Sequence, residues 1–258
     1  MATDLFSLHG RTALITGGSR GIGKMIAAGY IAQGAKVYIS SRKAAACDAT
    51  ATELSAGGGT CISLPQDVST VEGCKALAAR FGEHETKLDI LVNNAGAAWG
   101  AAFDEFPESG WDKVMNLNVK SPFFLTQALA APLRASASPT HPAKVINVAS
   151  IDGLRPNPME TYSYHASKAG LIQLTRRMAA QLIRDNIVVT AIAPGAFASE
   201  MNRDARDHAD EVARHIPSRR IGTDGDMQGV AIYLASRAGD YVVGSSITVD
   251  GGLVFADL

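Results

Sequence analysis

The stretch TALITGGSRGIG, residues 12–23, joins a strand pattern to a glycine-rich loop. The apolar and β-branched residues of TALIT are typical of a buried strand. Gly17, Gly21 and Gly23 permit a tight turn that brings backbone N–H groups close to a phosphate at the start of a helix. The spacing is TGxxxGxG rather than GxGxxG. Strand, loop and helix in this order predict the first βα unit of an α/β fold that binds a pyrophosphate.

Six further strand patterns follow, separated by alanine-rich helical stretches. They are KVYIS (36–40), TCISL (60–64), LDILV (88–92), KVINVA (144–149), IVVTAIA (187–193) and SITVD (246–250). Strands that are apolar on both faces are typical of a parallel sheet covered by helices on each side. We therefore expect one domain over 1–258, a doubly wound parallel sheet of about seven strands with ligands bound beyond the strands' carboxyl ends.

The composition excludes several classes of partner. The 24 Lys and Arg nearly balance the 25 Asp and Glu, which argues against binding to nucleic acid or an anionic membrane. No apolar run approaches the roughly 20 residues of a membrane span, and the first residues lack the basic region of a signal peptide. Cys47, Cys61 and Cys74 have no CxxC spacing, so we expect reduced thiols in a cytoplasmic protein without a metal site.

The end of the second predicted strand indicates which nicotinamide cofactor binds. An acidic side chain there would bond the adenosine 2′-hydroxyl and repel a 2′-phosphate. This chain has Ser41 at that position, with Arg42 beside it and Arg20 inside the glycine loop. Guanidinium groups bind phosphate through paired hydrogen bonds. The pattern predicts NADP(H) rather than NAD(H).

The stretch SYHASK, residues 163–168, holds the candidate reactive group. Tyr164 and Lys168 are four residues apart and share one face of a helix, whereas Tyr162 lies around the helix or in the preceding turn. We expect Lys168 to lower the phenol pKa of Tyr164 from its usual value near 10. Ser150, at the end of the fifth strand, is expected to donate to a carbonyl substrate. Tyr162 is interpreted as a wall or packing residue, placed with Glu160 at the pocket rim, and His165 is interpreted as structural.

These residues resemble the short-chain dehydrogenase/reductases over about 6–252. The likeness rests on TGGSRGIG, DV (67–68), NNAG (93–96), LNV (117–119), INVAS (146–150), YHASK (164–168), PG (194–195) and VDGG (249–252). The phrase LDILVNNAGAAWGAAFDEFPESGWDKVMNLNV is similar to bacterial 3-oxoacyl reductases linked to rhamnolipid synthesis. Asn93 and Gly96 can also simply fix the turn after their strand.

The resemblance implies roles for individual residues. Tyr164 would be the acid–base residue, Lys168 its pKa modifier and a ribose ligand, and Ser150 the donor to the substrate oxygen. Asn118 would hold a water through its helix and complete a proton relay from Lys168 to solvent. The cofactor-binding positions predicted in all are Gly17, Ser19, Arg20, Gly21, Ile22, Gly23, Ser41, Arg42, Asp67, Val68, Asn94, Ala95, Gly96, Tyr164, Lys168, Pro194, Gly195, Phe197 and Ser199.

Two departures from the family pattern concern the later part of the chain. TDGD (223–226) replaces the usual Pro-Glu-Glu, although Thr223 with Asp226 still forms a plausible capping pair. Asp152 and Arg155 follow the serine and would make the substrate pocket more polar than a fatty acyl chain requires. The charged segment 199–215 is either a solvated surface helix or part of a lid at about 196–220.

The expected function is NADPH-dependent reduction of a ketone, such as a 3-oxoacyl thioester, to a secondary alcohol. The alternative within enzymes is an NAD(P)-dependent sugar or polyol dehydrogenase, which the polar residues 152–160 would suit. A lyase or isomerase would also use the tyrosine, without net consumption of NADPH. A non-catalytic NADP(H)-binding regulator would be expected to lack the serine, tyrosine or lysine. The resemblance also implies a dimer or tetramer of identical chains, built on the helices that carry Asn118 and Tyr164.

Overall fold

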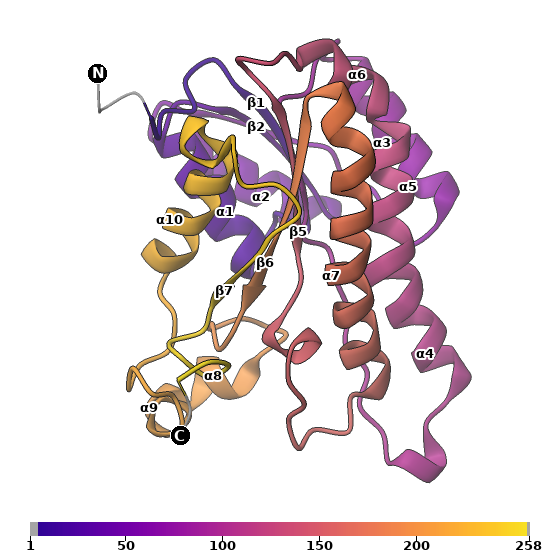
Figure 1. The fold of residues 1–258 in the computed structure, drawn as a ribbon, viewed down its shortest axis with the longest axis vertical. Coiled ribbons are helices and arrows are strands. Elements are labelled where there is room, and N and C mark those ends of the chain that lie inside the picture. Colours follow the sequence, from indigo (N-terminus) through magenta and orange to yellow (C-terminus); the bar gives the residue numbers. More distant parts are fainter. Residues whose placement is uncertain (1–4, 257–258) are drawn as a thin grey trace.

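A computed structural model describes residues 5–256 of the chain as one parallel sheet with helices on both faces (Figure 1). The strands are β1 Thr12–Thr16, β2 Lys36–Ser40, β3 Thr60–Ser63, β4 Ile90–Asn93, β5 Ala143–Val148, β6 Ile187–Pro194 and β7 Ser246–Val249. Their order in the sheet is β3-β2-β1-β4-β5-β6-β7, and every neighbouring pair is parallel. The predicted doubly wound sheet is confirmed, with strand ends displaced by at most two residues.

The helices form two layers. They are α1 Gly21–Ala32, α2 Ala44–Ser55, α3 Val71–Gly82, α4 Glu108–Met115, α5 Ser121–Ala128, α6 Ala130–Ser136, α7 Tyr162–Leu182, α8 Arg203–Asp207, α9 Ala209–Arg214 and α10 Asp224–Ala235. Figure 1 shows α1, α2 and α10 on one face of the sheet and α3, α4, α5 and α7 on the other. The capping pair of Thr223 and Asp226 at the start of α10 is confirmed, with reciprocal hydrogen bonds.

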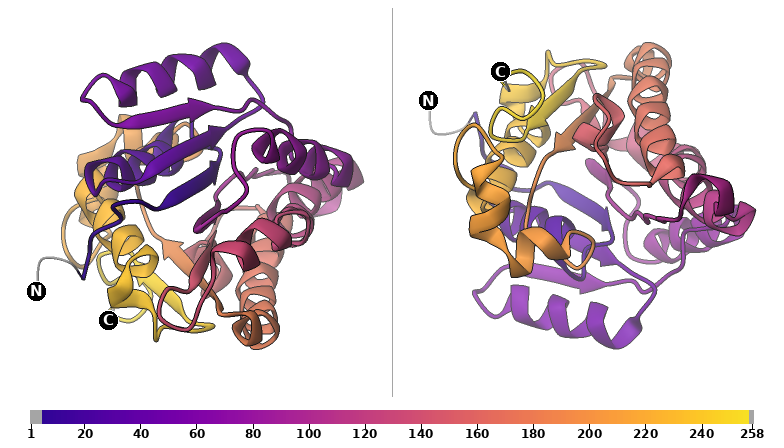
Figure 2. Two further views of the ribbon diagram at one scale, coloured as in Figure 1. Left: turned by 90° about the horizontal axis from the view of Figure 1, so that it is seen from above. Right: turned by 90° about the horizontal axis from the view of Figure 1, so that it is seen from below.

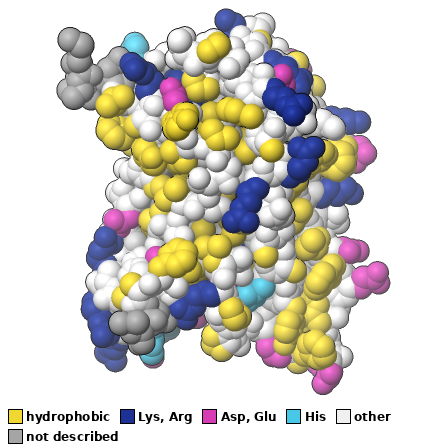
Figure 3. All heavy atoms as spheres, in the orientation of Figure 1, with side chains coloured by type: hydrophobic (Ala, Val, Ile, Leu, Met, Phe, Trp, Pro, Cys, Tyr) yellow, Lys and Arg dark blue, Asp and Glu magenta, His cyan; other side chains and the backbone are white. Residues whose placement is uncertain are grey.

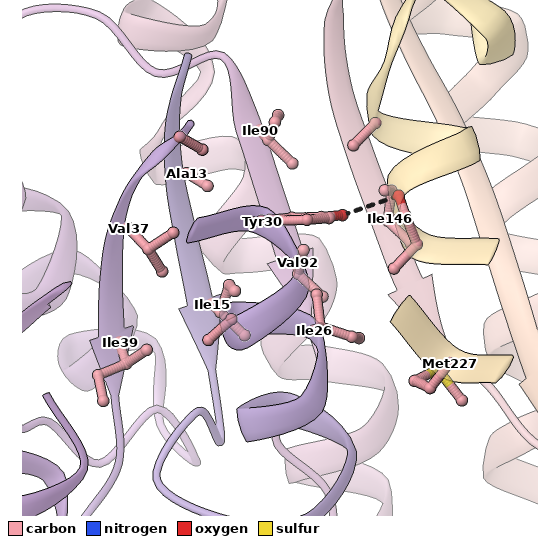
Figure 4. Close-up of a cluster of buried hydrophobic side chains, with 14 of the residues drawn as sticks. Ala13, Ile15, Ile26, Tyr30, Val37, Ile39, Ile90, Val92, Ile146 and Met227 are labelled. Atoms are coloured by element: carbon pink, nitrogen blue, oxygen red, sulfur yellow. Dashed lines mark hydrogen bonds between the residues drawn. The ribbon is translucent and has the colours of Figure 1, made fainter. Parts of the chain in front are cut away.

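A hydrophobic core fills the space between the sheet and each helical layer. On the α1 and α10 side, Tyr30 is fully buried among aliphatic residues from β1, β2, β4 and β5 (Figure 4). Its hydroxyl donates to the carbonyl of Ala231 in α10 at 3.2 Å, so the one polar atom of this side chain is satisfied. On the other side, Phe81 of α3 and Met178 of α7 belong to a second buried cluster. A sheet held rigidly on both faces fixes where its strand ends lie.

The strand order reverses between β1 and β4, which places a crevice at the carboxyl edge of the sheet. Figure 2, right, looks onto that edge, where the loops after the strands meet α8, α9 and the C-terminal segment. The charged segment expected as one helix or a lid forms the two short helices α8 and α9.

Two further expectations from the sequence concern membrane-spanning segments and the cysteine thiols. Within residues 5–256, no helix is long and apolar enough to cross a membrane. Cys47, Cys61 and Cys74 are buried free thiols, and burial raises the pKa of Cys61 to about 12.

Candidate active site

One cavity of about 570 Å³ runs along the carboxyl edge of the sheet and gathers nearly all the predicted site residues. It extends from the glycine loop and the end of β2, past the end of β4, to α7 and the segment after β6. The predicted residues in its wall are Gly17, Ser19, Arg20, Gly21, Ile22, Ser41, Arg42, Asp67, Val68, Asn94, Ala95, Gly96, Ser150, Tyr164, Lys168, Pro194, Gly195, Phe197 and Ser199. Residues that are distant in the sequence therefore form one continuous surface.

The glycine loop is held in a shape that larger residues would break. Gly17 has a φ of 66°, and a Cβ placed on it would lie 2.7 Å from Asn94 Nδ2. Asn94 Nδ2 donates to the carbonyls of Thr16 at 2.9 Å and Gly17 at 3.2 Å, which ties this loop to the end of β4. The loop leaves the start of α1 open to the cavity. A helix N-terminus with free N–H groups is a binding site for phosphate.

Gly23 does not line the cavity as predicted. It lies behind the loop, where an added Cβ would come within 2.3 Å of the Gly17 carbonyl oxygen. Because Gly23 has no side chain, the first turn of α1 can pack closely against the loop. Gly23 therefore supports the shape of the cavity wall without lining it.

Three cations flank the end of the cavity that the predicted adenosine would occupy. Arg20, Arg42 and Lys43 all belong to its wall and are exposed to solvent. Among residues 5–256, none of the three forms an ion pair, so their charges are available to an anion. Sequence analysis missed Lys43, although it follows Arg42 directly, because its side chain position depends on the start of α2.

At the opposite end, α7 carries Tyr164 and Lys168 on one face, as the four-residue spacing predicted. Lys168 Nζ lies 5.5 Å from the centre of the Tyr164 ring. The lysine is 4% exposed, and its ammonium donates to the Val148 carbonyl at 2.8 Å. The Tyr164 ring keeps some exposure because it faces the cavity.

Lys168 is not among the groups that shift the phenol pKa of Tyr164 in this structure, so the expected lowering by Lys168 stays a prediction. Burial raises the pKa of Tyr164 to about 12, and a hydrogen bond with Ser150 offsets only part of that rise. Burial also lowers the pKa of Lys168 to about 8. Desolvation disfavours the charged form of both groups, and it is the largest cause of both pKa shifts. Tyr164 is therefore a protonated phenol at neutral pH.

Ser150 lies two residues after the end of β5, beside Tyr164. Its hydroxyl accepts a hydrogen bond from the backbone N–H of Asp152 at 3.2 Å and begins the short 3₁₀ turn η4, Ile151–Gly153. Asp152 and Arg155 both line the cavity, which confirms the polar pocket expected from the sequence. Arg155 also donates to the carbonyl of Leu253, so the C-terminal segment closes part of this wall.

Asn118 is buried behind the cavity rather than in its wall, within the π-helical turn η3, Asn116–Lys120, between α4 and α5. Its Oδ1 accepts from the Ala97 N–H at 2.8 Å, and its Nδ2 donates to the Ala97 carbonyl at 2.9 Å and to Ser167 Oγ at 3.0 Å. The side chain thus joins the loop after β4 to α7. Such π turns occur often at functional sites.

Tyr162 and Glu160 do not lie at the rim of this cavity, contrary to the sequence interpretation. Tyr162 begins α7 and packs edge-to-face on Phe103 and Phe106, and its hydroxyl donates to Glu160 Oε1 at 3.2 Å. With Pro107, Glu108 and Trp111 these aromatic rings line a separate surface groove of about 350 Å³. We call Phe103, Phe106, Trp111 and Tyr162 the aromatic cluster.

His165 is interpreted as structural, and its contacts agree. The imidazole Nδ1 lies 3.0 Å from the carbonyl of Thr161 in the preceding turn. The ring does not line the cavity.

The segment after β6 forms the remaining wall. Pro194 and Gly195 lead into Phe197, which is buried against Gly222, and Ser199 accepts a hydrogen bond from the Asn202 N–H at 3.0 Å. Wall residues that the sequence analysis did not name individually are Ser40, Lys43, Ala46, Gln66, Ala98, Leu117, Val148, Ala149, Ile151, Pro156, Asn157, Met159, Thr161, Ala196, Glu200, Met201, Asn202, Asp204 and Leu253. Most come from loops, where no periodic pattern indicates which side chains face inward.

Comparisons with known proteins agree with this geometry. The short chain dehydrogenase family profile matches residues 11–210. The rhamnolipids biosynthesis 3-oxoacyl-(acyl-carrier-protein) reductase of Pseudomonas aeruginosa is 48% identical over 250 residues, 96% of this chain and 97% of that protein. A 2-dehydro-3-deoxy-D-gluconate 5-dehydrogenase of Dickeya dadantii is 38% identical over 258 residues, 98% of each chain.

A solved structure is similar over nearly the full length. The Pseudomonas aeruginosa RhlG/NADP active-site complex superposes with a TM-score of 0.94 at 48% identity and covers 98% of this chain and 99% of that one. The parallel sheet, the glycine loop after β1 and the grouping of Ser150, Tyr164 and Lys168 all lie within the aligned length. The chain belongs to the short chain dehydrogenase family of oxidoreductases.

Proposed function

We propose that this chain is an NADPH-dependent reductase that converts a ketone into a secondary alcohol. One observation carries the proposal: a single cavity has the Ser150, Tyr164 and Lys168 group at one end and, at the other, three cations that form no ion pair with any described residue. The first end suits a carbonyl and the second suits a phosphate. Their connection through one cavity fits a cofactor that must reach both.

The wall residues fit NADP(H). The Gly17 and Gly23 positions, where a Cβ would collide, leave room for a pyrophosphate at the start of α1. Arg20, Arg42 and Lys43 would hold the 2′-phosphate, and Lys168 would bond the nicotinamide ribose. When bound, the cofactor supplies the hydride for reduction. The NADP complex of the Pseudomonas aeruginosa relative supports the same choice.

The protein's own residues would orient the carbonyl and provide the proton. The Ser150 hydroxyl would donate to the substrate oxygen and hold it beside the Tyr164 phenol. Tyr164, protonated at neutral pH, would transfer its proton to that oxygen as negative charge develops. Asn118 would bridge to the solvent path that restores the proton, because it joins the loop at Ala97 to α7 beside Lys168.

A 3-oxoacyl thioester is the substrate class that we favour, since the 48% identical relative is named for that reaction. Oxidation or reduction of a sugar acid is the second candidate. It is favoured by the polar side chains of Asp152, Arg155 and Asn157 in the wall and by the 38% identical gluconate-type dehydrogenase.

Segment 196–220 is proposed as a lid over the substrate. Its residues Ser199, Glu200, Met201, Asn202 and Asp204 line the cavity opposite α7, while its helices α8 and α9 are only five and six residues long. Short helices with few buried residues can shift at little cost in stability.

We also propose a homo-oligomer of cytoplasmic chains. In the aromatic cluster, Phe103 of the short turn before α4 is 72% exposed and Trp111 of α4 is 42% exposed. Figure 3 shows hydrophobic side chains gathered over this region at the lower right, with acidic side chains beside them. An exposed aromatic patch of this kind suits contact with a second copy.

The test is consumption of NADPH, followed by absorbance, with 3-oxoacyl thioesters of increasing chain length, small diketones and 2-keto or 5-keto sugar acids. We expect turnover with 3-oxoacyl thioesters and a clear preference for NADPH over NADH. Turnover confined to the sugar acids would select the second candidate. No oxidation or reduction of any compound in the panel with either cofactor would overturn the proposal.

A further inference from the structure

The three polar side chains that favour a sugar acid are tied to the protein itself. Asn157 uses both ends of its amide: Nδ2 donates to Asp152 Oδ1 at 2.9 Å, and Oδ1 accepts from the Met159 N–H at 2.8 Å. Arg155 donates to the backbone carbonyl of Leu253, beyond β7. These hydrogen bonds hold the loop between η4 and α7 in one shape and attach it to the C-terminal segment. A polar substrate would therefore have to compete with the wall for these groups.

Three apolar side chains reach the same cavity from three separate segments. Met159 on the loop before α7 is 60% exposed and Met201 on the segment after β6 is 52% exposed, and both line the cavity. Side chains that line a cavity and also face solvent mark its mouth. Leu253, half-buried, lines the cavity from the segment after β7. Figure 1 shows the loop after β5, α8 and the segment after β7 at the same lower end of the molecule. We call Met159, Met201 and Leu253 the apolar mouth.

The charges in this part of the wall do not favour an anionic substrate. The cations Arg155 and Lys168 both donate to backbone carbonyls. The same part of the wall contains three carboxylates, on Asp152, Glu200 and Asp204. A sugar acid would add a further negative charge beside them, whereas an alkyl chain adds none.

We propose that the apolar mouth is a subsite for the alkyl chain of the ketone substrate, and that it selects an aliphatic 3-oxoacyl group over a sugar acid. The inference rests on the proposed function and deepens it by naming the residues that choose the substrate. The same cavity wall contains Ser150 and Tyr164, so a chain that extends from a carbonyl held there can leave the site past these three side chains. Methionine side chains are flexible and polarisable, so they can adapt to chains of different length.

The test is the dependence of kcat/KM on chain length, measured for 3-oxoacyl thioesters that share one thiol and differ only in the alkyl chain. Burial of each additional methylene should raise kcat/KM by about fourfold until the chain passes the mouth. In the double variant Met159→Gln, Met201→Gln, both side chains keep their length but become polar. The ratio of kcat/KM for the longest substrate to that for the shortest should then fall by about tenfold.

Two variants serve as controls. Met159→Leu combined with Met201→Leu keeps the mouth apolar and should keep the ratio close to that of the unaltered enzyme. Leu154→Asn also removes an exposed apolar side chain from the loop after β5, but Leu154 lies outside the cavity wall that the described residues form, so the ratio should not change. A ratio that is unaltered in the glutamine double variant, or lowered equally by Leu154→Asn, would overturn the inference.

Binding without turnover separates this inference from the proposed function. Straight-chain alkyl amides contain no ketone, so their dissociation constants, measured by calorimetry in the presence of NADP⁺, report the subsite alone. Each methylene should lower the dissociation constant by about fourfold in the unaltered protein and by less in the glutamine double variant. That result without reduction of any ketone would leave the inference standing while the proposed function fails. Equal kcat/KM for short and long ketones, with amide binding that does not depend on length, would overturn the inference while the proposed function stands.

Discussion

Lys168 lies 5.5 Å from the centre of the Tyr164 ring, yet its ammonium donates to the carbonyl of Val148 rather than to the phenol. The lysine is thus attached to the end of β5, one turn along α7 from the proposed acid. Because of this attachment, Tyr164 and Lys168 have different tasks. Tyr164 remains a protonated donor, and Lys168 supplies a positive charge at the floor of the cavity.

Replacing Tyr164 with Phe should lower kcat by about 10²–10⁴-fold, because the substrate oxygen loses its proton donor. The ring and its packing remain, so the dissociation constant for NADPH, measured by fluorescence titration, should change by no more than a few-fold. A variant that keeps most of its kcat would exclude Tyr164 as the acid.

The buried ammonium of Lys168 costs stability, so Lys168→Met should unfold at higher denaturant concentration while losing activity. Its pKa falls from 10.5 to about 8, which corresponds to about 3 kcal/mol at most. The loss of the hydrogen bond to Val148 offsets part of this gain.

The pH dependence of that gain has a definite sign. Below pH 8 the lysine is charged in both the folded and the unfolded state, and the full cost applies. Between pH 8 and 10.5 the folded protein releases the proton first, so the advantage of the methionine variant should shrink to near zero. Urea unfolding at several pH values measures this, and an advantage that grew with pH would contradict it.

The cofactor preference should depend on the cations at the far end of the cavity. Arg42→Ala should raise the KM for NADPH by about 10-fold or more, since a hydrogen bond between charged groups contributes about 1.5–3 kcal/mol. The KM for NADH should hardly change. Lys24→Ala, on α1 but paired with Glu53 outside the cavity, is the matched control and should affect neither cofactor. An equal rise in the KM for NADPH and for NADH would show that Arg42 does not bind the 2′-phosphate.

Gly23→Ala should weaken both the fold and NADPH binding, because the new Cβ would approach the Gly17 carbonyl oxygen and Asn94 Nδ2. Gly229→Ala is the comparison. It lies within α10 with open space around it, and alanine there should stabilise the protein by about 0.8–1 kcal/mol. Thermal unfolding and the KM for NADPH measure both effects. If the two variants had the same stability and the same KM for NADPH, the glycine loop would tolerate a side chain at position 23.

The oligomer should depend on the aromatic cluster. Trp111→Ser should shift the sedimentation coefficient toward that of a monomer, because it removes an exposed ring from the proposed contact. Tyr241→Ser is the control: that tyrosine is fully exposed and lies outside the cluster, so its loss should leave the assembly unchanged. An unaltered sedimentation coefficient for Trp111→Ser would exclude this contact surface.

The sequence predicts the elements of this site better than their electrostatics. The run from Thr12 to Gly23 joins strand, loop and helix as expected, because local spacing alone dictates that turn. The four-residue interval between Tyr164 and Lys168 likewise determines a shared helical face. The pKa of Tyr164 could not be predicted in this way, since it depends on how much water the surrounding loops exclude.

Tyr162 illustrates the other limit. Its position on the helix is predictable, but its partners Phe103 and Phe106 come from a loop about 60 residues earlier, whose path is set by tertiary packing. Lys43 and Leu253 enter the cavity wall for the same reason. Sequence patterns predict which residues share a face of one helix or strand. They do not predict which residues come into contact when two loops that are distant in the sequence pack together.

The π-helical turn at Asn116–Lys120 has a consequence for engineering. Such a turn is equivalent to one residue inserted into an α-helix, so it rotates everything on one side by about 100° relative to the other. Deleting a single residue there would restore a regular helix but would swing Trp111 out of alignment with α5. The orientation of the exposed surface of α4 and the position of the buried Asn118 therefore depend on the same turn. An insertion or deletion that alters one would displace the other.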